Sequence, residues 1–321
     1  MQLRRLGSAG PVTSAIGLGT LGLTGGYGPV DRDEAVATLW HALDAGVTLL
    51  DTADFYGGGA VESLLGTAIK GRRDDVVVAT RGGALFTPEG RPLGVDGSPQ
   101  RLRAACDASL RRLGVDHIDL YYLARVDPEV PVEESTGALA ELVAAGKVRH
   151  IGLSEVSAQE LRRAAAVHPV AALASEYSLF ERQIEGTVLP VARELGVGLV
   201  ACSPLGRGLL TGRLTSVDQL GDGDYRRNHP RFAPEHFARN RALVRRAERL
   251  AAERDVSVGR LVLAWLLAQG PDVVPIPGTR CTTNLEMNVA ATRVRLTEQE
   301  LRLLAEAIPP DAVSGDRSPR R

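Results

Sequence analysis

Asp51 and Tyr56 are the residues of this chain whose types and spacing best suit chemistry. They follow residues 48–50, a short β-branched and aliphatic run that predicts a buried strand, and three glycines come directly after them. In a parallel α/β sheet, reactive side chains stand at the carboxyl ends of the strands. A carboxylate five residues before a phenol at such an end therefore predicts a proton donor, Tyr56, with an acidic neighbour.

Other strand ends suggest a ligand that carries phosphate. After the seventh predicted strand, residues 203–208 (Ser-Pro-Leu-Gly-Arg-Gly) offer backbone N–H groups, a hydroxyl and a cation. After the eighth, Gly278, Thr279 and Arg280 precede a short helix whose amino end can hold an anion. A phosphate site after strands 7 and 8 recurs in eight-stranded α/β barrels. The alternative is that these glycine-rich loops only turn the chain.

Strand and helix patterns alternate along the chain and must position these residues. We predict strands at 13–19, 48–53, 76–81, 118–124, 148–154, 172–178, 198–203 and 273–277. We predict helices at 33–45, 61–70, 99–113, 132–145, 158–167, 185–195, 237–254, 258–269, 283–291 and 298–308. Eight strand–helix pairs predict the α/β class and a (β/α)8 TIM barrel, formed by one domain over residues 1–321.

The segments outside this alternation have simpler expectations. Residues 1–6 together with Val12 predict an amino-terminal β-hairpin that plugs the barrel. Residues 82–97 and 204–235 are expected to be long loops, and the tail from Pro309 is expected to be loose. A doubly wound open sheet is the alternative fold, because Gly17, Gly19 and Gly22 match the G-x-G-x-x-G spacing. No helix opens directly after them, so we expect these glycines to line a barrel mouth instead.

Composition narrows the class of protein. The chain has 321 residues, 44% of them hydrophobic, and a formal net charge of −1 with both signs interspersed. Nothing in this balance indicates a nucleic-acid or membrane partner. The three cysteines lie far apart and the six histidines are not spaced as ligands, so we expect neither a disulfide framework nor a metal site. We expect a cytoplasmic protein with a small-molecule substrate, and its oligomeric state stays open.

Several segments together resemble one enzyme family. They are residues 51–57 (Asp-Thr-Ala-Asp-Phe-Tyr-Gly), 76–80, 109–122, 147–154, 175–179, 203–208 and 276–279. The chain resembles the aldo-keto reductases over nearly its whole length, in particular the bacterial branch with Asp-Thr-Ala-Asp-x-Tyr-Gly. The resemblance implies NADP(H) bound across the barrel mouth and reduction of a carbonyl. It further implies a tyrosine proton donor, a lysine that lowers the pKa of that tyrosine, an aspartate that holds the lysine, and a histidine that orients the substrate.

Carried over to this chain, the resemblance gives an unusual catalytic set. Asp51 and Tyr56 match, whereas Arg81 takes the place of the lysine and Ala124 that of the histidine. With the two phosphate loops, it predicts NADP(H) contacts at Gly19, Thr20, Ser154, Ser203, Leu205, Gly206, Arg207, Gly278, Thr279, Arg280 and Asn288. Other family positions are altered as well, namely those of Glu155, Ala174, Cys202 and Met287.

These departures have physical consequences. Arg81 keeps a positive charge near Tyr56, but its planar guanidinium can instead pair with Asp51. Ala124 removes one donor to a developing oxyanion, which typically costs about 10²–10³ in rate. We also expect Ala124 to open space beside Tyr56 and so to admit a larger carbonyl or a conjugated enone, such as a secondary metabolite.

Three functions stay open on the sequence alone. The first is an NADP(H)-dependent oxidoreductase with an atypical site. The second is a non-redox dehydratase, isomerase or cyclase that uses Tyr56, Asp51 and Arg81 as acid, base and oxyanion holder. The third is a binding or scaffold protein that has lost catalysis.

Overall fold

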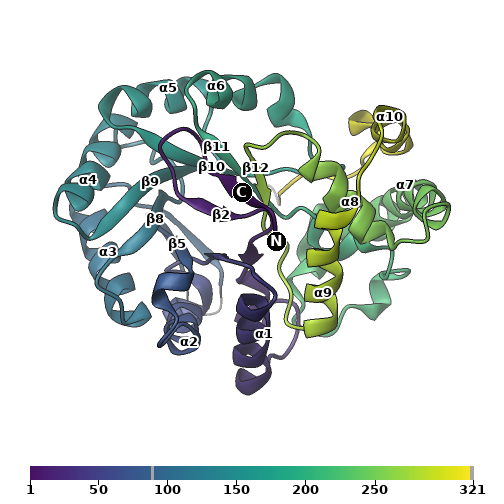
Figure 1. Ribbon diagram of the computed structural model, residues 1–321, viewed down its shortest axis with the longest axis horizontal. Coiled ribbons are helices and arrows are strands. Elements are labelled where there is room, and N and C mark those ends of the chain that lie inside the picture. Colours follow the sequence, from purple (N-terminus) through teal and green to yellow (C-terminus); the bar gives the residue numbers. More distant parts are fainter. Residues whose placement is uncertain (88–89, 319–321) are drawn as a thin grey trace.

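The computed structural model describes residues 1–87 and 90–318. Its central sheet is parallel and eight-stranded, in the order β3-β4-β5-β8-β9-β10-β11-β12, and it curls into the predicted (β/α)8 barrel (Figure 1). Its strands are β3 (Leu18–Gly19), β4 (Leu49–Asp51), β5 (Val77–Gly82), β8 (Ile118–Leu123), β9 (Val148–Ser154), β10 (Val170–Glu176), β11 (Gly198–Cys202) and β12 (Val273–Pro275). The barrel closes between β3 and β12, where Gly19 forms a bridge with Gly278 and the N–H of Gly17 donates to the carbonyl of Pro275 at 3.0 Å.

Helices surround the barrel (Figure 1). They are α1 (Arg32–Asp44), α2 (Ala60–Ala68), α3 (Pro99–Leu113), α4 (Val132–Ala144), α5 (Ala158–Val167), α6 (Val188–Glu194), α7 (Pro234–Ala252), α8 (Val258–Leu267), α9 (Thr282–Ala290) and α10 (Glu298–Ala307). Local signals explain their bounds. Ser157 caps α5 in a capping box with Glu160, and α3 ends at Gly114, whose φ of 66° suits glycine.

The core has two layers, as the alternation along each strand requires. On β4, Leu49 points into the barrel, where it packs with Leu120 of β8 and Val200 of β11. Its neighbour Leu50 belongs to the outer layer between the strands and the helices. Filling the barrel with apolar side chains leaves only the carboxyl ends of the strands for polar chemistry.

The predicted amino-terminal hairpin is present. Strand β1 (Leu3–Arg5) pairs antiparallel with β2 (Val12–Ser14), and the hairpin lies across the barrel in Figure 1. Leu6, fully buried, joins the interior cluster of the barrel. Arg4 donates from Nη1 to the carbonyl of Gly270 and from Nη2 to that of Leu267, both at 2.8 Å. The hairpin therefore plugs the end of the barrel opposite the polar strand ends.

Three local expectations were wrong. The predicted strand 13–19 is divided between β2 and β3, because the Ser14 hydroxyl donates to the carbonyl of Ile16 at 2.7 Å and turns the chain between them. The expected loop 82–97 contains an antiparallel pair, β6 (Ala84–Phe86) and β7 (Pro92–Val95). Helix α6 begins only at Val188, since Pro190 has no N–H and fits only the first turn of a helix.

The tail was also expected to be loose, and this is wrong for its described part. The N–H of Ser314 donates to Oδ1 of Asn240 on α7, and Nδ2 of Asn240 donates to the carbonyl of Ser314, both at 2.8 Å. Arg317 pairs with Glu155 and Glu176 at the ends of β9 and β10. The partners lie more than 70 residues away in the sequence, so no local pattern indicates them.

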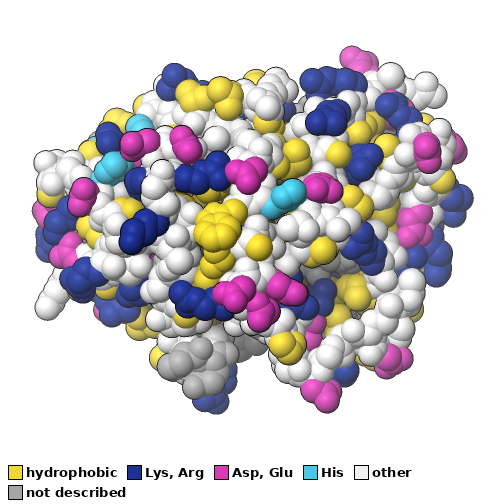
Figure 2. Space-filling model, turned by 60° about the horizontal axis from the view of Figure 1, so that its bottom comes forward, with side chains coloured by type: hydrophobic (Ala, Val, Ile, Leu, Met, Phe, Trp, Pro, Cys, Tyr) yellow, Lys and Arg dark blue, Asp and Glu magenta, His cyan; other side chains and the backbone are white. Residues whose placement is uncertain are grey.

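The surface shows charges of both signs. On the face drawn in Figure 2, basic and acidic side chains alternate with small apolar groups. Within the described residues, no helix combines the length and the apolar character needed to cross a membrane.

Candidate active site

A cavity of about 390 Å³ lies at the carboxyl ends of the strands. Its walls include Asp51, Tyr56, Arg81 and Cys202. They also include most of the predicted cofactor contacts, namely Gly19, Ser203, Leu205, Arg207, Gly278, Thr279, Arg280 and Asn288. Residues from distant parts of the sequence thus meet in one place, because parallel strands bring their carboxyl ends together.

Asp51 and Arg81 form a buried ion pair within this wall. Asp51 ends β4 and Arg81 stands near the end of the adjacent β5, and they are 2% and 6% exposed. Nη2 of Arg81 donates to Oδ1 of Asp51, and Nε donates to the carbonyl of Thr52 at 3.3 Å. The guanidinium carbon also lies 4.9 Å from the ring centre of Tyr122. Three contacts of different kinds, an ion pair, a hydrogen bond to the backbone and a cation-π contact, therefore hold Arg81 in one orientation.

Burial and the attraction between the two charges act in opposite directions on the pKa of each member of the pair. Burial raises the pKa of Asp51 to about 6, although Arg81 pulls it down. For Arg81 burial acts in the opposite sense, but the negative charge of Asp51 and the neighbouring Tyr56 raise its pKa above the ordinary value. At pH 8 both groups are charged, so the pair as a whole adds little net charge to the cavity.

Tyr56 opens a 3₁₀ turn at Tyr56–Gly59 that leads into α2. Gly57 and Gly58 have φ values of 59° and 61°, which glycine adopts at no steric cost. The Tyr56 hydroxyl has no hydrogen-bond partner within the described chain. Burial raises the pKa of Tyr56 well above its ordinary value, and Arg81 opposes this only in part. At neutral pH the phenol is protonated and free to donate to a ligand oxygen.

A second part of the cavity wall is cationic. Arg213, Arg260 and Arg280 line it, and none of them has a carboxylate within ion-pair distance in the part of the chain that the structure describes. Arg280 donates to the carbonyls of Gly28 and Pro29 at 2.7 and 2.8 Å, and Nε of Arg260 is buried without a partner. A buried N–H without a partner is costly. This wall is therefore suited to an anion.

Sequence reasoning missed Arg213 and Arg260. Arg213 lies in the long segment after β11, yet it donates to Oδ1 of Asn284 and, at 3.5 Å, to Sδ of Met287 on α9. Arg260 stands three residues after Ser257, the residue that caps α8. Neither position carries a local signal, because only the folded barrel brings α8, α9 and this segment around one cavity.

Arg207 lines the cavity, but its charge is compensated. It forms a two-pronged pair with Glu176, with Nη1–Oε1 and Nη2–Oε2 distances of 2.8 and 3.0 Å. Glu176 also accepts from Nε of Arg317 at 3.2 Å. The cation that the sequence assigned to phosphate binding thus contributes less charge than the three unpaired arginines.

Three predicted contacts, Thr20, Ser154 and Gly206, do not line the cavity. All three are buried, and the Thr20 hydroxyl donates to the carbonyl of Asp51 at 2.9 Å. Ala124 is fully buried and does not line the cavity either, so the expected space beside Tyr56 is absent. The side chain of Arg125 folds back over this strand end and donates to the carbonyl of Ala124 at 2.6 Å.

The first glycine motif serves the closure of the barrel. A Cβ on Gly19 would lie 2.8 Å from the carbonyl oxygen of Ile276, and one on Gly17 would lie 2.9 Å from its Cγ2. Glycine is therefore required for β3 to approach β12. This agrees with a barrel mouth and not with a dinucleotide fingerprint of an open sheet.

Comparison with known proteins gives a consistent result. The family model described as "Aldo/keto reductase family" matches residues 15–309. The chain is 43% identical to "Probable aldo-keto reductase 1" of Glycine max, over 98% of this chain and 90% of the relative. It is 44% identical to "Aldo-keto reductase yakc [NADP(+)]" of Schizosaccharomyces pombe, over 95% and 91% respectively.

Solved structures agree with these relatives. The glycerol dehydrogenase of Gluconobacter oxydans superposes with a TM-score of 0.86 at 32% identity, over 96% of both chains. An aldo-keto reductase of Bacillus halodurans gives a TM-score of 0.81 at 28% identity, over 97% of both chains. By its sequence, its barrel and its relatives, the chain belongs to the aldo/keto reductase family.

Proposed function

We propose that this protein is an NADP(H)-dependent oxidoreductase that reduces a carbonyl or a conjugated enone, with Tyr56 as proton donor. One observation carries the proposal: a protonated phenol beside a buried Asp51–Arg81 pair and a wall of unpaired arginines line the same cavity. We further propose that the substrate is a secondary metabolite larger than a simple aldehyde, held in the cavity of about 390 Å³ itself and not in space beside Ala124. We also infer that residues 1–321 act as one domain, since the lining residues extend from Gly19 to Asn288.

The cationic wall fits the phosphates of NADP(H). Arg213, Arg260 and Arg280 would hold them, because three guanidinium groups that have no carboxylate partner among the described residues match a dinucleotide that bears an additional phosphate. The name of the fission yeast relative, which specifies NADP(+), supports the same choice. The cofactor would supply the hydride, and the protein supplies position and the proton.

Tyr56 is suited to reduction. Its raised pKa keeps the proton at neutral pH, and the oxygen of a carbonyl becomes a strong base as hydride arrives. Arg81 stabilises the phenolate left behind, but Asp51 offsets part of its charge. The reverse reaction needs the phenolate from the start, so the site favours reduction over alcohol oxidation.

We propose that Arg81 and Ala124 replace the usual lysine and histidine of the family. Ala124 offers no side-chain donor, and it is fully buried away from the cavity. The substrate oxygen would then depend on Tyr56, and turnover would be slower by about 10²–10³ than with a second donor in place.

NADPH titration followed by protein fluorescence tests the first step. We expect binding at micromolar concentrations, and a protein that fails to bind would overturn the proposal. In the bound protein, Tyr56→Phe should abolish carbonyl reduction while NADPH affinity stays the same. The double change Arg81→Lys with Ala124→His should raise the rate of reduction. Full activity in Tyr56→Phe would remove this tyrosine from the mechanism.

A further inference from the structure

Arg125 presents a free guanidinium edge at the mouth of the barrel. It comes two residues after β8 ends, and its side chain is exposed. Its Nη1 donates to the carbonyl of Ala124 at 2.6 Å and to Oγ of Ser154 at 3.3 Å. Nε and Nη2 make no hydrogen bond within residues 1–87 and 90–318, nor does any carboxylate there reach ion-pair distance. One edge of the group is thus fixed by the protein and the other edge is open.

The charges around Arg125 do not neutralise it. Glu155 is the nearest candidate, but it pairs with Arg317 and accepts the N–H of Glu176 at 2.8 Å. Partial desolvation lowers the pKa of Arg125, Glu155 opposes this, and the positive charge of Arg81 lowers the pKa further. Arg81 and Arg317 each have carboxylate partners, whereas Arg125 has none in the described chain.

Arg125 does not line the cavity itself, but the order of the strands places it near the end of the cavity that Arg81 lines. The strands β5 and β8 are neighbours, and the N–H of Ala124 donates to the carbonyl of Gly82, which follows Arg81, at 2.8 Å. Arg125 therefore lies one strand away from the Arg81 end of the cavity. The arginines assigned to cofactor phosphate lie instead on segments after β11 and β12, which are distant from β8 in the order of the sheet. Arg125 is thus separate from the phosphate wall.

We propose that Arg125 binds an anionic group of the substrate, so that the substrates are carbonyl compounds that carry a carboxylate or a phosphate. The Nε and Nη2 donors of a guanidinium match the two oxygens of such a group side by side. No carboxylate of residues 1–87 or 90–318 has to be displaced, and the bonds to Ala124 and Ser154 already orient the group. This inference rests on the proposed reductase function and names the substrate class of that site.

Matched substrates test the inference. We compare 4-carboxybenzaldehyde with its uncharged methyl ester, and glyceraldehyde 3-phosphate with glyceraldehyde, each with NADPH. The ratio of kcat/KM for the charged over the neutral member cancels any general effect of a substitution on the cofactor. We expect Arg125→Leu to lower this ratio about 10- to 100-fold, mainly through KM, as loss of charge-assisted hydrogen bonds predicts. Whichever pair shows the larger loss identifies the anion as carboxylate or phosphate.

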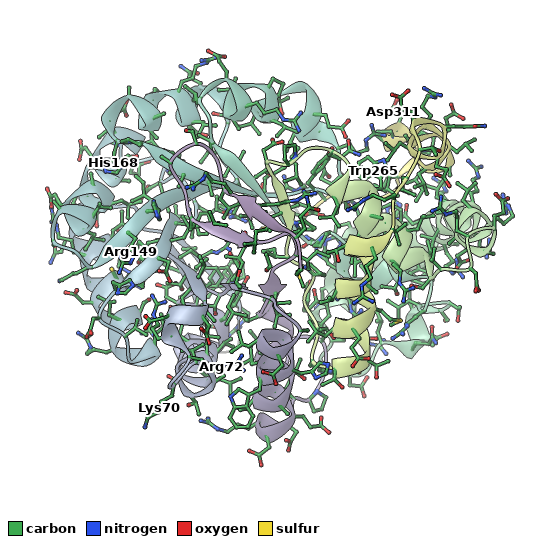
Figure 3. All side chains as sticks on the ribbon, in the orientation of Figure 1. Lys70, Arg72, Arg149, His168, Trp265 and Asp311 are labelled. Atoms are coloured by element: carbon green, nitrogen blue, oxygen red, sulfur yellow. The ribbon has the colours of Figure 1, made fainter. Side chains whose placement is uncertain are left out.

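Two further variants serve as controls. Arg125→Lys keeps the charge without the planar fork, so it should recover part of the ratio. Arg149→Leu removes another exposed arginine, near the start of β9 and therefore at the opposite end of the barrel (Figure 3). This change should leave the ratio as in the unaltered protein. Thermal unfolding of each variant verifies that it is folded.

The outcomes separate the inference from the proposed function. An unchanged ratio in Arg125→Leu, with reduction intact, overturns the inference and leaves the reductase standing. If no carbonyl is reduced, binding of terephthalate to the NADP⁺-mixed protein, measured by calorimetry, decides instead. Binding that Arg125→Leu abolishes would support the anion site without the reductase. Absence of binding at millimolar terephthalate, or equal binding by both proteins, would overturn the anion site.

Discussion

Replacing Arg81 by methionine would leave the buried carboxyl of Asp51 without its counter-ion. In the native protein the pKa of Asp51 is raised from 3.8 to about 6, so this carboxyl is charged at pH 8. Arg81→Met removes the only guanidinium that is bound to it in the described structure. The pKa of Asp51 then rises further, and the folded protein keeps this proton above pH 6 while the unfolded chain releases it.

The magnitude follows from proton linkage. When a carboxyl has a higher pKa in the folded than in the unfolded protein, its protonation stabilises the folded state. This contribution is fully present below pH 3.8, the unfolded pKa of Asp51, and is lost as the pH rises through the folded pKa. In the native protein this loss ends near pH 6, whereas in Arg81→Met it continues. Each pH unit is worth about 1.4 kcal/mol, so the variant should lose about 2.7 kcal/mol more than the native protein between pH 6 and pH 8.

Urea denaturation at pH 6, 7 and 8 measures this difference in the free energy of unfolding. Methionine retains the length and the apolar volume of the side chain, so the packing loss should not depend on pH. The double variant Asp51→Asn, Arg81→Met has no titrating carboxyl and should show no added pH dependence. A difference that stays constant from pH 6 to pH 8, or an equal slope in the double variant, would refute the electrostatic account of this pair.

Three other predictions follow from the same geometry. Burial is the main cause, and the charge of Glu62 the next, that raises the pKa of Asp54 to about 7, so its buried negative charge destabilises the folded protein at pH 8. In urea denaturation, Asp54→Asn should therefore raise the free energy of unfolding by about 1–3 kcal/mol at pH 8 and by less at pH 5. Arg260→Leu should weaken NADPH binding about tenfold with little effect on NADH, whereas Arg72→Leu should change neither in a fluorescence titration. Because the pKa of Tyr56 is raised, initial rates of alcohol oxidation should increase up to pH 10, while rates of carbonyl reduction should not increase from pH 7 to 9.

Much of the fold was predictable because its signals are local. The β-branched runs before Asp51 and Arg81 and the capping residue Ser157 each act within a few residues, and the alternation of elements leaves few topologies. The division of the first predicted strand was not predictable, since it depends on where the Ser14 side chain finds partners. These include the N–H of Thr48, which donates to Oγ of Ser14 at 2.9 Å.

Part of the lining of the cavity was predictable from the sequence, but the pairing of its charges was not. Parallel strands bring Asp51, Tyr56 and Arg81 together whatever their partners are. That Arg207 is paired with Glu176, and that Arg260 is not paired in the described chain, depends on contacts between segments far apart in the sequence. Whether an arginine forms an ion pair depends on which residues the fold places beside it, and the sequence around that arginine does not indicate this.

The narrow join between the first and last strands has a mechanical consequence. Strand β3 has only two residues, Leu18–Gly19, and Gly19 forms a bridge with Gly278, which follows β12; both glycines line the cavity. Because this join is so short, we expect the barrel to open there first on heating or under mechanical load. A dinucleotide bound over Gly19 and Gly278 would bridge this join and stabilise the closed barrel. Dissociation of the ligand and opening of the barrel at this join would then be the same event.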